Sequence, residues 1–508
     1  MGDANAATVL VDRHAAAGRG DRTAVVAGEE RWSYARLQSE VWSRQRVLAA
    51  LGVGAGERVA LVVDDEPAFL AWFLGALRSG VVPVPLSTML TGTELAAIVA
   101  DAGAAAAVFS PRHAARAAAV RSGAPALRHV VTVGDDTAGT GPEPPVAAVD
   151  PGAPAFLLYS SGTTGVPKGV VHRHGDLGAT VRGFARHVLD VGPDDRCHSV
   201  SKLFFAYGLG NALTFPLWAG ATTILNPAPP TPASVADLAA RERPTLLFLT
   251  PGVAAGLLAA GVPPAALASV RLTVSAGEAL PAALHRRFTG RYGHPLLDGI
   301  GTTEALHTFC SNRAGQERPG TSGTPVPGWD LELRDDTGTA VTTPDVPGNL
   351  HVRGPSLATG YWGRPVETAA AFADGWFATG DVFTRSADGY WTHQGRRGDM
   401  IRAGAIWVSP AEVEAVLAEH DDVAEVAVVA GRDQDGLEVT VAFVVPAAGR
   451  AVDAGALDTH CRARMAAFKR PRRVVVVDAL PRTATGKVRR VDLRARLAAE
   501  RAGDGPGG

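Results

Sequence analysis

The sequence predicts an α/β protein with a large N-terminal domain of βαβ-type sheets plus a small β-barrel-like part, followed by a small mobile α+β C-terminal domain. Three observations predict this class. The chain has 508 residues, 46% of them hydrophobic, which suits roughly three structural units. Before Trp329, short β-branched runs alternate with Ala- and Leu-rich helical stretches, a pattern typical of βαβ units. After Trp329, apolar and polar residues alternate, as in a partly exposed sheet.

The strands expected in the N-terminal part are short apolar runs bounded by turn residues. They are Thr23–Ala27, Arg58–Val63, Ala105–Phe109, His129–Val133, Ala155–Tyr159, Thr222–Leu225, Thr245–Thr250, Val270–Val274 and Pro295–Leu297. Helical segments such as Thr93–Ala102 and Pro281–Tyr292 lie between them, so the sheets should be mostly parallel. The long uncharged stretch Pro244–Ser269 contains several prolines, and we interpret it as a buried strand, a turn and a helix.

The C-terminal part should contain the barrel-like sheet and then a compact α+β unit. Asp330–Arg334 and Asn349–Arg353 are the alternating strands of the former. In the latter, Ser409 suits a helix N-cap and Pro410 the first helical position. Its expected strands are Glu425–Val429, Val439–Val445 and Val474–Val477. We therefore expect one domain over residues 1–395 and a second over residues 396–508.

Composition excludes several classes of function. The net charge of −2 argues against a nucleic-acid or anionic-membrane partner. The three cysteines, Cys197, Cys310 and Cys461, are too far apart for a zinc motif and are interpreted as reduced core thiols. The N-terminus has no signal-peptide pattern, so a cytoplasmic protein is expected. Of 49 basic residues only four are lysines, namely Lys168, Lys202, Lys469 and Lys487, and each merits inspection.

The strongest motif is the run YSSGTTGVPKGV, Tyr159–Val170, which follows an expected strand. Its glycines permit a close backbone approach, its hydroxyls and N–H groups can hold phosphate oxygens, and Lys168 can neutralise them. It is not a Walker A loop, whose spacing differs. The run resembles the phosphate loop of the adenylate-forming superfamily, which comprises acyl- and aryl-CoA ligases, peptide-synthetase adenylation domains and luciferases. The resemblance covers nearly the whole chain.

This resemblance implies an ATP site whose members are spread along the sequence. The implied contacts are Ser160, Ser161, Gly162, Thr163, Thr164 and Lys168 in the phosphate loop, Gly277 and Glu278 in the adenine-side loop Ser275–Pro281, Thr303 on the α-phosphate, Asp381 and Arg396 on the ribose, and Lys487. A carboxylate beside phosphates is a natural Mg²⁺ ligand, so Glu304 is the expected metal ligand. Lys487, in Pro481–Lys487, resembles the catalytic lysine of the family, and Thr303 and Glu304 complete the expected catalytic group.

Two segments resemble the acyl pocket of benzoate-CoA ligase and related aryl-CoA ligases, namely Ser201–Asn211 and Gly301–Asn312. The resemblance implies that the acyl group is bordered by Ala206, Tyr207, Gly208, Ile300, Gly301 and His307. No Asp or Glu occurs from Cys197 to Ala236, which disfavours an amino-acid substrate because its ammonium would need a partner. Apolar walls with small Gly and Ala residues suit a ring. Phe204, Phe205 and His307 as ordinary core residues remain an alternative.

The segment after Gly395 departs from the family pattern. Gly398 stands where the family usually has Asp or Lys, Arg402 where it often has Lys, and Ala405, next to Gly404, where it often has Gly. The resemblance places Gly398 at the hinge between the domains and the hairpin with Gly404 and Ala405 beside the pantetheine tunnel. An Ala that needs φ > 0 would cost roughly 1–2 kcal/mol. The balance between the two half-reactions is therefore in question.

The sequence as a whole predicts an ATP-dependent carboxylate-CoA ligase that uses ATP, Mg²⁺ and coenzyme A on a small carboxylic acid, aromatic or bulky and cyclic. Alternatives stay open. The enzyme could serve one half-reaction beside a partner ligase, or load the phosphopantetheine of a carrier protein. An inactive homologue and a luciferase-like oxygenase are the remaining interpretations, and a homodimer is compatible with all of them.

Overall fold

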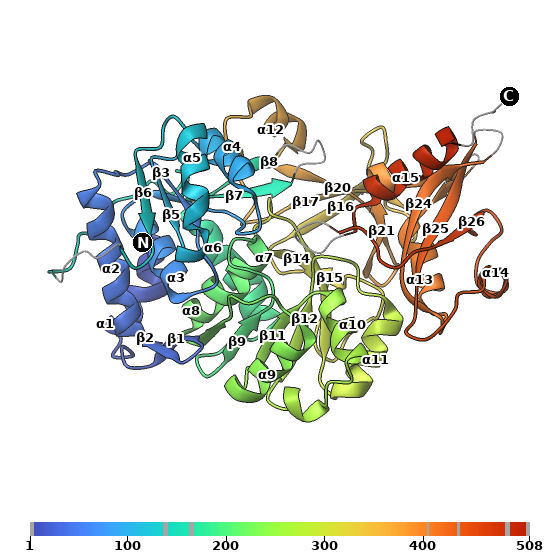
Figure 1. Ribbon diagram of the computed structural model, residues 1–508, viewed down its shortest axis with the longest axis horizontal. Helices are drawn as coiled ribbons and strands as arrows, with labels where there is room; N and C mark the ends of the chain where they lie inside the picture. The colour runs from blue at the N-terminus through green and yellow to red at the C-terminus, as the bar shows by residue number, and fades with distance from the viewer. Residues whose placement is uncertain are drawn as a thin grey trace.

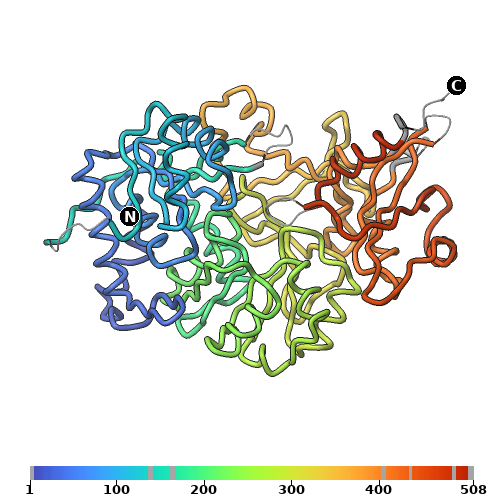
Figure 2. Tube along the Cα trace, in the orientation of Figure 1, coloured from blue at the N-terminus to red at the C-terminus, as the bar shows by residue number. Residues whose placement is uncertain are grey.

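The computed structural model describes residues 5–135, 141–161, 167–403, 406–433, 437–482 and 488–503. The chain starts at one end of the long axis and finishes at the other, with the middle of the sequence between them (Figures 1 and 2). Its N-terminal domain is large and rich in sheets, and the smaller C-terminal domain stands apart at the far end of the view. The predicted fold class is confirmed.

A nine-stranded sheet forms the centre of the N-terminal domain. Its strands follow the order β15 (Thr324–Pro325), β14 (Thr308–Ser311), β13 (Leu296–Gly301), β12 (Leu272–Ser275), β11 (Leu246–Leu249), β9 (Arg196–Ser199), β10 (Thr222–Leu225), β1 (Thr23–Ala27) and β2 (Glu30–Ser33). The stretch from β13 through β12, β11, β9 and β10 to β1 is parallel, and the strands at both edges pair antiparallel. The parallel strands are almost wholly buried, as expected for a sheet covered on both faces.

Helices and short helical turns flank this sheet. They are η1 (Thr8–Asp12), α1 (Arg13–Ala16), α6 (His174–Thr180), η3 (Val181–Ala185), α7 (Ala206–Leu209), η4 (Gly210–Thr214), α8 (Phe215–Ala219), α9 (Pro232–Glu242), α10 (Pro251–Ala259), η5 (Pro264–Leu267) and α11 (Ala282–Tyr292). Helices α9, α10 and α11 lie together at the lower side of Figure 1. The stretch Pro244–Ser269 forms β11, a turn and α10, as predicted.

A second, four-stranded sheet is parallel throughout. Its order is β4 (Val82–Pro85), β3 (Arg58–Val62), β5 (Ala106–Phe109) and β6 (His129–Thr132), with α2 (Tyr34–Ala50), α3 (Pro67–Arg78), α4 (Gly92–Ala102), η2 (Pro111–Arg116) and α5 (Ala117–Gly123) around it. Helix α4 begins at a capping box, in which Thr91 accepts from the Glu94 N–H and Glu94 accepts from the Thr91 N–H. Helix α3 is buried almost completely, which its continuous apolar sequence dictates.

Two antiparallel sheets complete the N-terminal domain. The hairpin of β7 (Phe156–Ser161) and β8 (Pro167–His172) pairs with β18 (Gly360–Tyr361). The other sheet contains β16 (Asp330–Arg334), β17 (Gly348–Arg353), β20 (Trp376–Arg385), β19 (Phe372–Ala373) and β21 (Trp391–Arg396), with α12 (Pro365–Ala371) beside it. Both strands expected in the barrel-like part, Asp330–Arg334 and Asn349–Arg353, are found there.

The C-terminal domain is an α+β unit. After η6 (Arg397–Asp399) come β22 (Ile401–Ala403), β23 (Ile406–Val408), α13 (Pro410–Leu417), β24 (Val423–Arg432), β25 (Glu438–Pro446), α14 (Ala454–Arg462), β26 (Arg473–Val476) and α15 (Arg490–Gly503). Ser409 caps α13 by accepting from the Glu412 N–H, and Pro410 occupies the first turn, as predicted.

The three cysteines are free and buried, which agrees with core thiols. Burial raises the pKa of each thiol, so none is a reactive thiolate at neutral pH. Among the helices that the structure describes, none is both long and apolar enough to cross a membrane.

Candidate active site

Three of the predicted site segments begin at the same edge of the central sheet. The acyl segment follows β9, and the adenine-side loop follows β12. The Gly299–Glu304 segment starts in the last residues of β13 and continues beyond its end. These strands lie parallel within the series β13, β12, β11 and β9, so their carboxyl ends face one way. In open α/β sheets, ligands bind outside the carboxyl ends of the strands. The topology therefore brings distant parts of the sequence to one edge.

The phosphate-loop hairpin meets this edge at Glu304. The Ser160 hydroxyl donates to Glu304 Oε1 at 3.4 Å, and the Tyr361 hydroxyl donates to the same oxygen at 3.1 Å. Lys168 Nζ lies 5.2 Å from the centre of the Tyr361 ring. Burial, and after it the Glu304 carboxylate, raises the pKa of Tyr361, so its hydroxyl stays protonated and can donate. A buried carboxylate, a lysine and hydroxyls thus surround one point.

The backbone next to Glu304 is fixed from two sides. His172 Nε2 lies 2.8 Å from the Thr303 carbonyl, and Nδ1 lies 3.4 Å from Asp176 Oδ2. On the other side, the Ala358 N–H donates to the Glu304 carbonyl at 2.8 Å. His172 belongs to β8, which follows the phosphate loop, so this imidazole connects the two halves of the expected phosphate site. Sequence reasoning missed it because a histidine in an apolar strand has no local signal.

The predicted ribose residues are neighbours across two strands. Asp381 on β20 pairs in register with Arg396 on β21. Arg396 Nε lies 3.0 Å from Asp381 Oδ1, and an Arg396 guanidinium nitrogen donates to the Thr379 carbonyl at 2.9 Å. The Asp381 side chain is nearly inaccessible, and the guanidinium is about half exposed. The pair therefore presents a fixed carboxylate beside a partly open cation.

The acyl segment is held by hydrogen bonds of Tyr207 and His307. The Tyr207 hydroxyl donates to the Val274 carbonyl of β12 at 3.2 Å. His307 Nε2 lies 3.1 Å from Asn211 Oδ1, so the neutral ring with a proton on Nε2 makes this bond. The rings of Phe184, Phe215 and Tyr207 surround His307 with centroid distances between 4.6 and 5.4 Å. His307 is thus part of an aromatic cluster next to the Tyr207 backbone.

The glycines of this region serve backbone packing. A Cβ on Gly208 would stand 2.0 Å from the Lys202 carbonyl oxygen, and one on Gly210 would stand 2.3 Å from His307 Cδ2. A Cβ on Gly301 would stand 2.4 Å from the His307 carbonyl oxygen. The space that a Gly208 side chain would fill is therefore already occupied. The missing side chain at Gly208 therefore gives the backbone of residues 201 and 202 room to approach.

We expect Gly208→Ala to destabilise the protein by roughly 1–3 kcal/mol, because the new methyl group meets two backbone oxygens that cannot rotate away. The free energy of unfolding in denaturant measures this cost. Gly175→Ala is the matched control. Gly175 is an exposed residue of α6 with no atom within 4 Å of its added Cβ, so the control should be neutral or stabilising. A stable Gly208→Ala protein would contradict the packing argument.

Acid should weaken the protein through His307. Burial lowers the pKa of His307 to about 3, against 6.5 when it is exposed. Between these values the unfolded chain binds a proton at this residue and the native chain does not, so stability falls as the pH falls below 6.5. Between pH 7 and pH 5, the free energy of unfolding of wild type should fall by about 2 kcal/mol more than that of His307→Gln. Denaturant unfolding of both proteins at the two pH values tests this, and parallel losses would contradict it.

Two buried polar residues add to the site: Asp298, which sequence reasoning missed, and Ser275, which it placed in the adenine-side loop without a contact of its own. They are register partners on β13 and β12, and neither Asp298 Oδ1 nor Ser275 Oγ has a hydrogen-bond partner among the described residues. Burial raises the pKa of Asp298 well above its usual value. Buried polar atoms without partners are uncommon in native proteins. The available signal was a carboxyl within an apolar strand beside the GIGTTE run.

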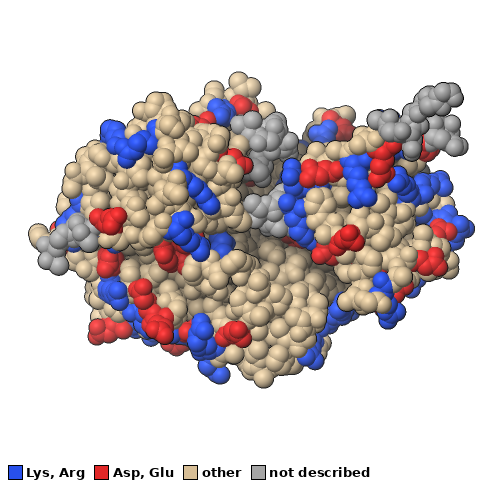
Figure 3. Space-filling view, in the orientation of Figure 1, with Lys and Arg blue, Asp and Glu red and all other residues tan. Residues whose placement is uncertain are grey.

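The C-terminal domain approaches the site through Arg482. Arg482 lies 3.7 Å from Glu278 of the adenine-side loop and 2.8 Å from Glu425 of its own domain. Gly277, beside Glu278, has φ +98°, which only glycine adopts readily. Arg482 begins the segment that ends at Lys487, so this segment starts beside the adenine-side loop. Figure 3 shows basic side chains on the edge of the C-terminal domain that faces the hollow between the domains.

Comparison with known proteins identifies the family. The family model described as "AMP-binding enzyme" matches residues 12–362, and the model described as "AMP-binding enzyme C-terminal domain" matches residues 412–487. The chain belongs to the AMP-binding enzyme family. The adenylate-forming superfamily predicted from the sequence is thereby confirmed, with aryl-CoA ligases among its similar members.

Three relatives of this AMP-binding enzyme cover nearly all of it. Benzoate–CoA ligase of Thauera aromatica is 41% identical over 96% of this chain and 95% of its own length. The structure of a benzoate CoA ligase from Burkholderia xenovorans superposes with a TM-score of 0.90 at 38% identity, covering 96% of this chain and 99% of that one. An anthranilate CoA ligase in complex with anthranoyl-AMP has a TM-score of 0.92 at 34% identity, covering 98% of both chains.

Several predicted site residues lie outside what the structure describes. These are Gly162, Thr163, Thr164, Gly404, Ala405 and Lys487, together with the side chains of Ser161 and Arg402. Gly398 lies in η6, and a Cβ there would meet no atom within 4 Å. Ile300 is half-buried and packs against the core that contains Phe184 and Phe215, whereas Ala206 is half-buried against the core that contains Leu203 and Leu209. Of the alternative core residues, Phe204 is buried and Phe205 is half-buried against it.

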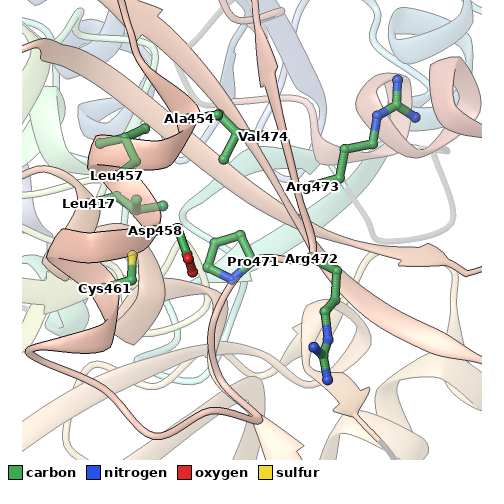
Figure 4. Close-up of a pocket in the computed structure, with 9 residues that line it drawn as sticks. All are labelled: Leu417, Ala454, Leu457, Asp458, Cys461, Pro471, Arg472, Arg473 and Val474. Carbon is green, nitrogen blue, oxygen red and sulfur yellow. The ribbon is translucent and has the colours of Figure 1, made fainter.

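One pocket of the AMP-binding enzyme lies away from this site, in the C-terminal domain (Figure 4). Its volume is about 280 Å³, and its wall includes Leu457, Cys461 and Val474. Arg472 and Arg473 extend away from the apolar wall in the close-up, and Asp458 points toward Pro471. None of its lining residues was predicted as a site residue. We assign it no role in the chemistry.

Proposed function

We propose that this chain is an ATP-dependent aryl-CoA ligase, which converts an aromatic acid and ATP into acyl-AMP and pyrophosphate and then transfers the acyl group to the thiol of coenzyme A with release of AMP. The observation that carries the proposal is the position of Glu304. Its carboxylate accepts from Ser160 of the phosphate-loop hairpin and from Tyr361, close to Lys168. The near full-length similarity to benzoate–CoA ligase supports the thioester product.

In the first half-reaction, the acid's carboxylate attacks the α-phosphorus and pyrophosphate leaves. We assign the α-phosphate to Thr303 and the β- and γ-phosphates to the phosphate loop with Lys168. Asp381 would accept hydrogen bonds from the ribose hydroxyls, with Arg396 as the second contact. The unpartnered atoms of Asp298 and Ser275 suit the polar edge of the adenine base, beside Gly277 and Glu278. Lys487 would stabilise the charge that develops between carboxylate and phosphate.

Glu304 fits a magnesium ligand. Mg²⁺ uses one or two carboxylates together with phosphate oxygens, so it needs no cluster of acidic residues, and no metal-binding cluster occurs among the described residues. When bound, Mg²⁺ would neutralise charge on the phosphates. Ser160 and Tyr361 hold the carboxylate through one oxygen, Oε1. Neither contact involves the other oxygen, Oε2, which we assign to the metal.

In the second half-reaction, the C-terminal domain would rotate about Gly398 to complete the thioester site. We divide the domains at residues 395 and 396 and place the pantetheine tunnel beside Gly404 and Ala405. The ion pair of Arg482 with Glu278 suits the pose for adenylation, since it sets the Lys487 segment beside the adenine-side loop. Specialisation for one half-reaction is the second candidate, favoured by the residues at Gly398, Arg402 and Ala405.

The acid is proposed to be benzoate-like and to contact Ala206, Tyr207, Gly208, Ile300, Gly301 and His307. The cluster around His307 is aromatic, and burial keeps that histidine neutral, so the site favours an uncharged ring over an ammonium. A cytoplasmic setting accords with the use of ATP and CoA. A carrier protein as acyl acceptor and a homodimeric state are retained as subsidiary proposals.

Mass spectrometry of reactions with ATP, Mg²⁺ and a panel of aryl and cyclic acids, with and without CoA, tests the function. We expect acyl-AMP without CoA and acyl-CoA with it. Acyl-AMP without any acyl-CoA would favour an enzyme specialised for one half-reaction or an enzyme that depends on a carrier protein. Adding a phosphopantetheinylated carrier distinguishes the two, because only the second would load it. No product from any acid, with turnover of synthetic acyl-AMP and CoA, would show that adenylation has been lost.

A further inference from the structure

Lys202, the second residue of the acyl segment Ser201–Asn211, has a confined side chain. Its Nζ donates to the carbonyls of Asn226 at 2.6 Å and Ala228 at 2.8 Å, and it lies 4.0 Å from Asp65 Oδ2. Asp65 itself accepts from the Leu203 N–H at 3.0 Å. The side chain of Lys202 is 18% exposed and that of Asp65 is 2% exposed. A compact ammonium suits this position, whereas the chain uses arginine for nearly all its other cations.

The backbone of Lys202 supports the start of α7. Its carbonyl accepts from the Phe205 N–H at 3.0 Å and fills the place of a Gly208 side chain. Helix α7 carries Ala206 and Tyr207, so any shift of the Lys202 backbone moves these residues. The side chain connects this backbone to two loops, the one between β3 and α3 through Asp65 and the one after β10 through Asn226 and Ala228. The side-chain contacts of Lys202 are thus with protein groups outside the acyl segment.

We propose that Lys202, together with Asp65, is a positioning residue that sets the wall of the acyl pocket and thereby the choice of acid. The inference rests on the proposed function, in which Ala206, Tyr207 and Gly208 border the acyl group. Lys202 acts through the backbone of α7 and does not contact the acid. The effect should therefore concern the acid alone, and the binding of ATP should be unchanged.

Removing the ammonium should not unfold the protein. Burial raises the pKa of Asp65 to about 7, and the Lys202 charge opposes that rise. In Lys202→Met, Asp65 would bind a proton at neutral pH, so no buried charge is left alone. Ala228 is exposed and Asn226 is half-buried, so water can donate to their carbonyls in place of Nζ. Lys202→Met therefore removes only the side-chain link between the acyl segment, the loop with Asp65 and the loop with Asn226 and Ala228.

The test compares Lys202→Met, Lys202→Arg and Asp65→Asn in the full-length enzyme. Acyl-AMP formation is followed by pyrophosphate release with benzoate and ring-substituted benzoates. For Lys202→Met we expect the KM for the acid to rise about tenfold and the ratio between acids to flatten, since small displacements in a binding site are costly. The KM for ATP should stay within about twofold, as remote binding groups are untouched. Lys202→Arg should be intermediate, because it keeps the charge but not the shape.

Lys469→Met is the matched control. This lysine lies in the C-terminal domain in an ion pair with Glu412, and its loss should leave the KM for the acid unchanged. Equal changes in the KM for acid and for ATP, or an unchanged preference among acids in Lys202→Met, would overturn the inference.

A second readout does not depend on turnover. Amide hydrogen exchange of residues 205–210 should be faster in Lys202→Met than in wild type, and unchanged exchange would overturn the inference. If wild type forms no acyl-AMP from any aromatic acid, the proposed function fails, and the exchange measurement alone then decides whether Lys202 fixes α7.

Discussion

Replacing Lys487 by alanine should slow acyl-AMP formation by roughly 10²–10³-fold, since a preorganised donor at developing charge has an effect of this size. The reason lies in the first half-reaction, where negative charge gathers between the acid's carboxylate and the α-phosphate. Arg482 sets the start of the Lys487 segment beside the adenine-side loop through Glu278. The second half-reaction needs no such cation, so synthetic acyl-AMP and CoA should react at nearly the wild-type rate.

The two half-reactions are measured separately, the first by pyrophosphate release without CoA and the second by acyl-CoA formation from acyl-AMP. Lys469→Ala is the control for the first, because it removes another lysine of the same domain, whose ammonium pairs with Glu412 and lies over the Phe468 ring. An equal loss in both half-reactions would indicate that Lys487 supports the structure of the domain. An unchanged rate of adenylation would remove Lys487 from the mechanism.

Local signals in the sequence predicted most of the fold. The strands Thr23–Ala27, Thr222–Leu225 and Asp330–Arg334 have the predicted bounds, because each is a short apolar or alternating run with clear turn residues on both sides. The start of α13 at Ser409 was predicted equally well, since the Ser409 side chain and the following proline determine it. Strand β4 (Val82–Pro85) was missed because it contains two prolines, which are uncommon inside strands.

The site was predictable where chemistry and order along the chain coincide, and not where it depends on contacts between distant segments. Glu304 was predicted from its motif, whereas Tyr361, which donates to it, follows no motif and reaches it through the pairing of β18 with β8. The close approach of the Lys202 carbonyl to Gly208 was likewise not predicted, because the turn before α7 brings the two together. Sequence spacing does not encode such contacts.

Replacing Glu304 by glutamine should lower the rate of adenylation roughly 100-fold at limiting Mg²⁺, because the side chain that we assign as a ligand of the phosphate-bound Mg²⁺ loses its charge. The amide keeps the shape of the side chain and can still accept from Ser160 and Tyr361 through its carbonyl oxygen, so the fold should persist. Pyrophosphate release measured over a range of Mg²⁺ concentrations tests the assignment. The Mg²⁺ concentration at half-maximal rate should rise, and excess Mg²⁺ should restore part of the activity.

The control for this variant is Glu29→Gln, which makes the same change in the exposed turn between β1 and β2 and should leave the Mg²⁺ dependence unaltered. A loss in Glu304→Gln that is equal at every Mg²⁺ concentration would contradict the role of metal ligand. Glu304 would then act by holding Ser160 and Tyr361 in place, and Tyr361→Phe should reproduce the defect. If Glu304 binds the metal, Tyr361→Phe removes only one donor to Oε1 and should be the milder variant, because the carboxylate keeps both its charge and its contact with Ser160.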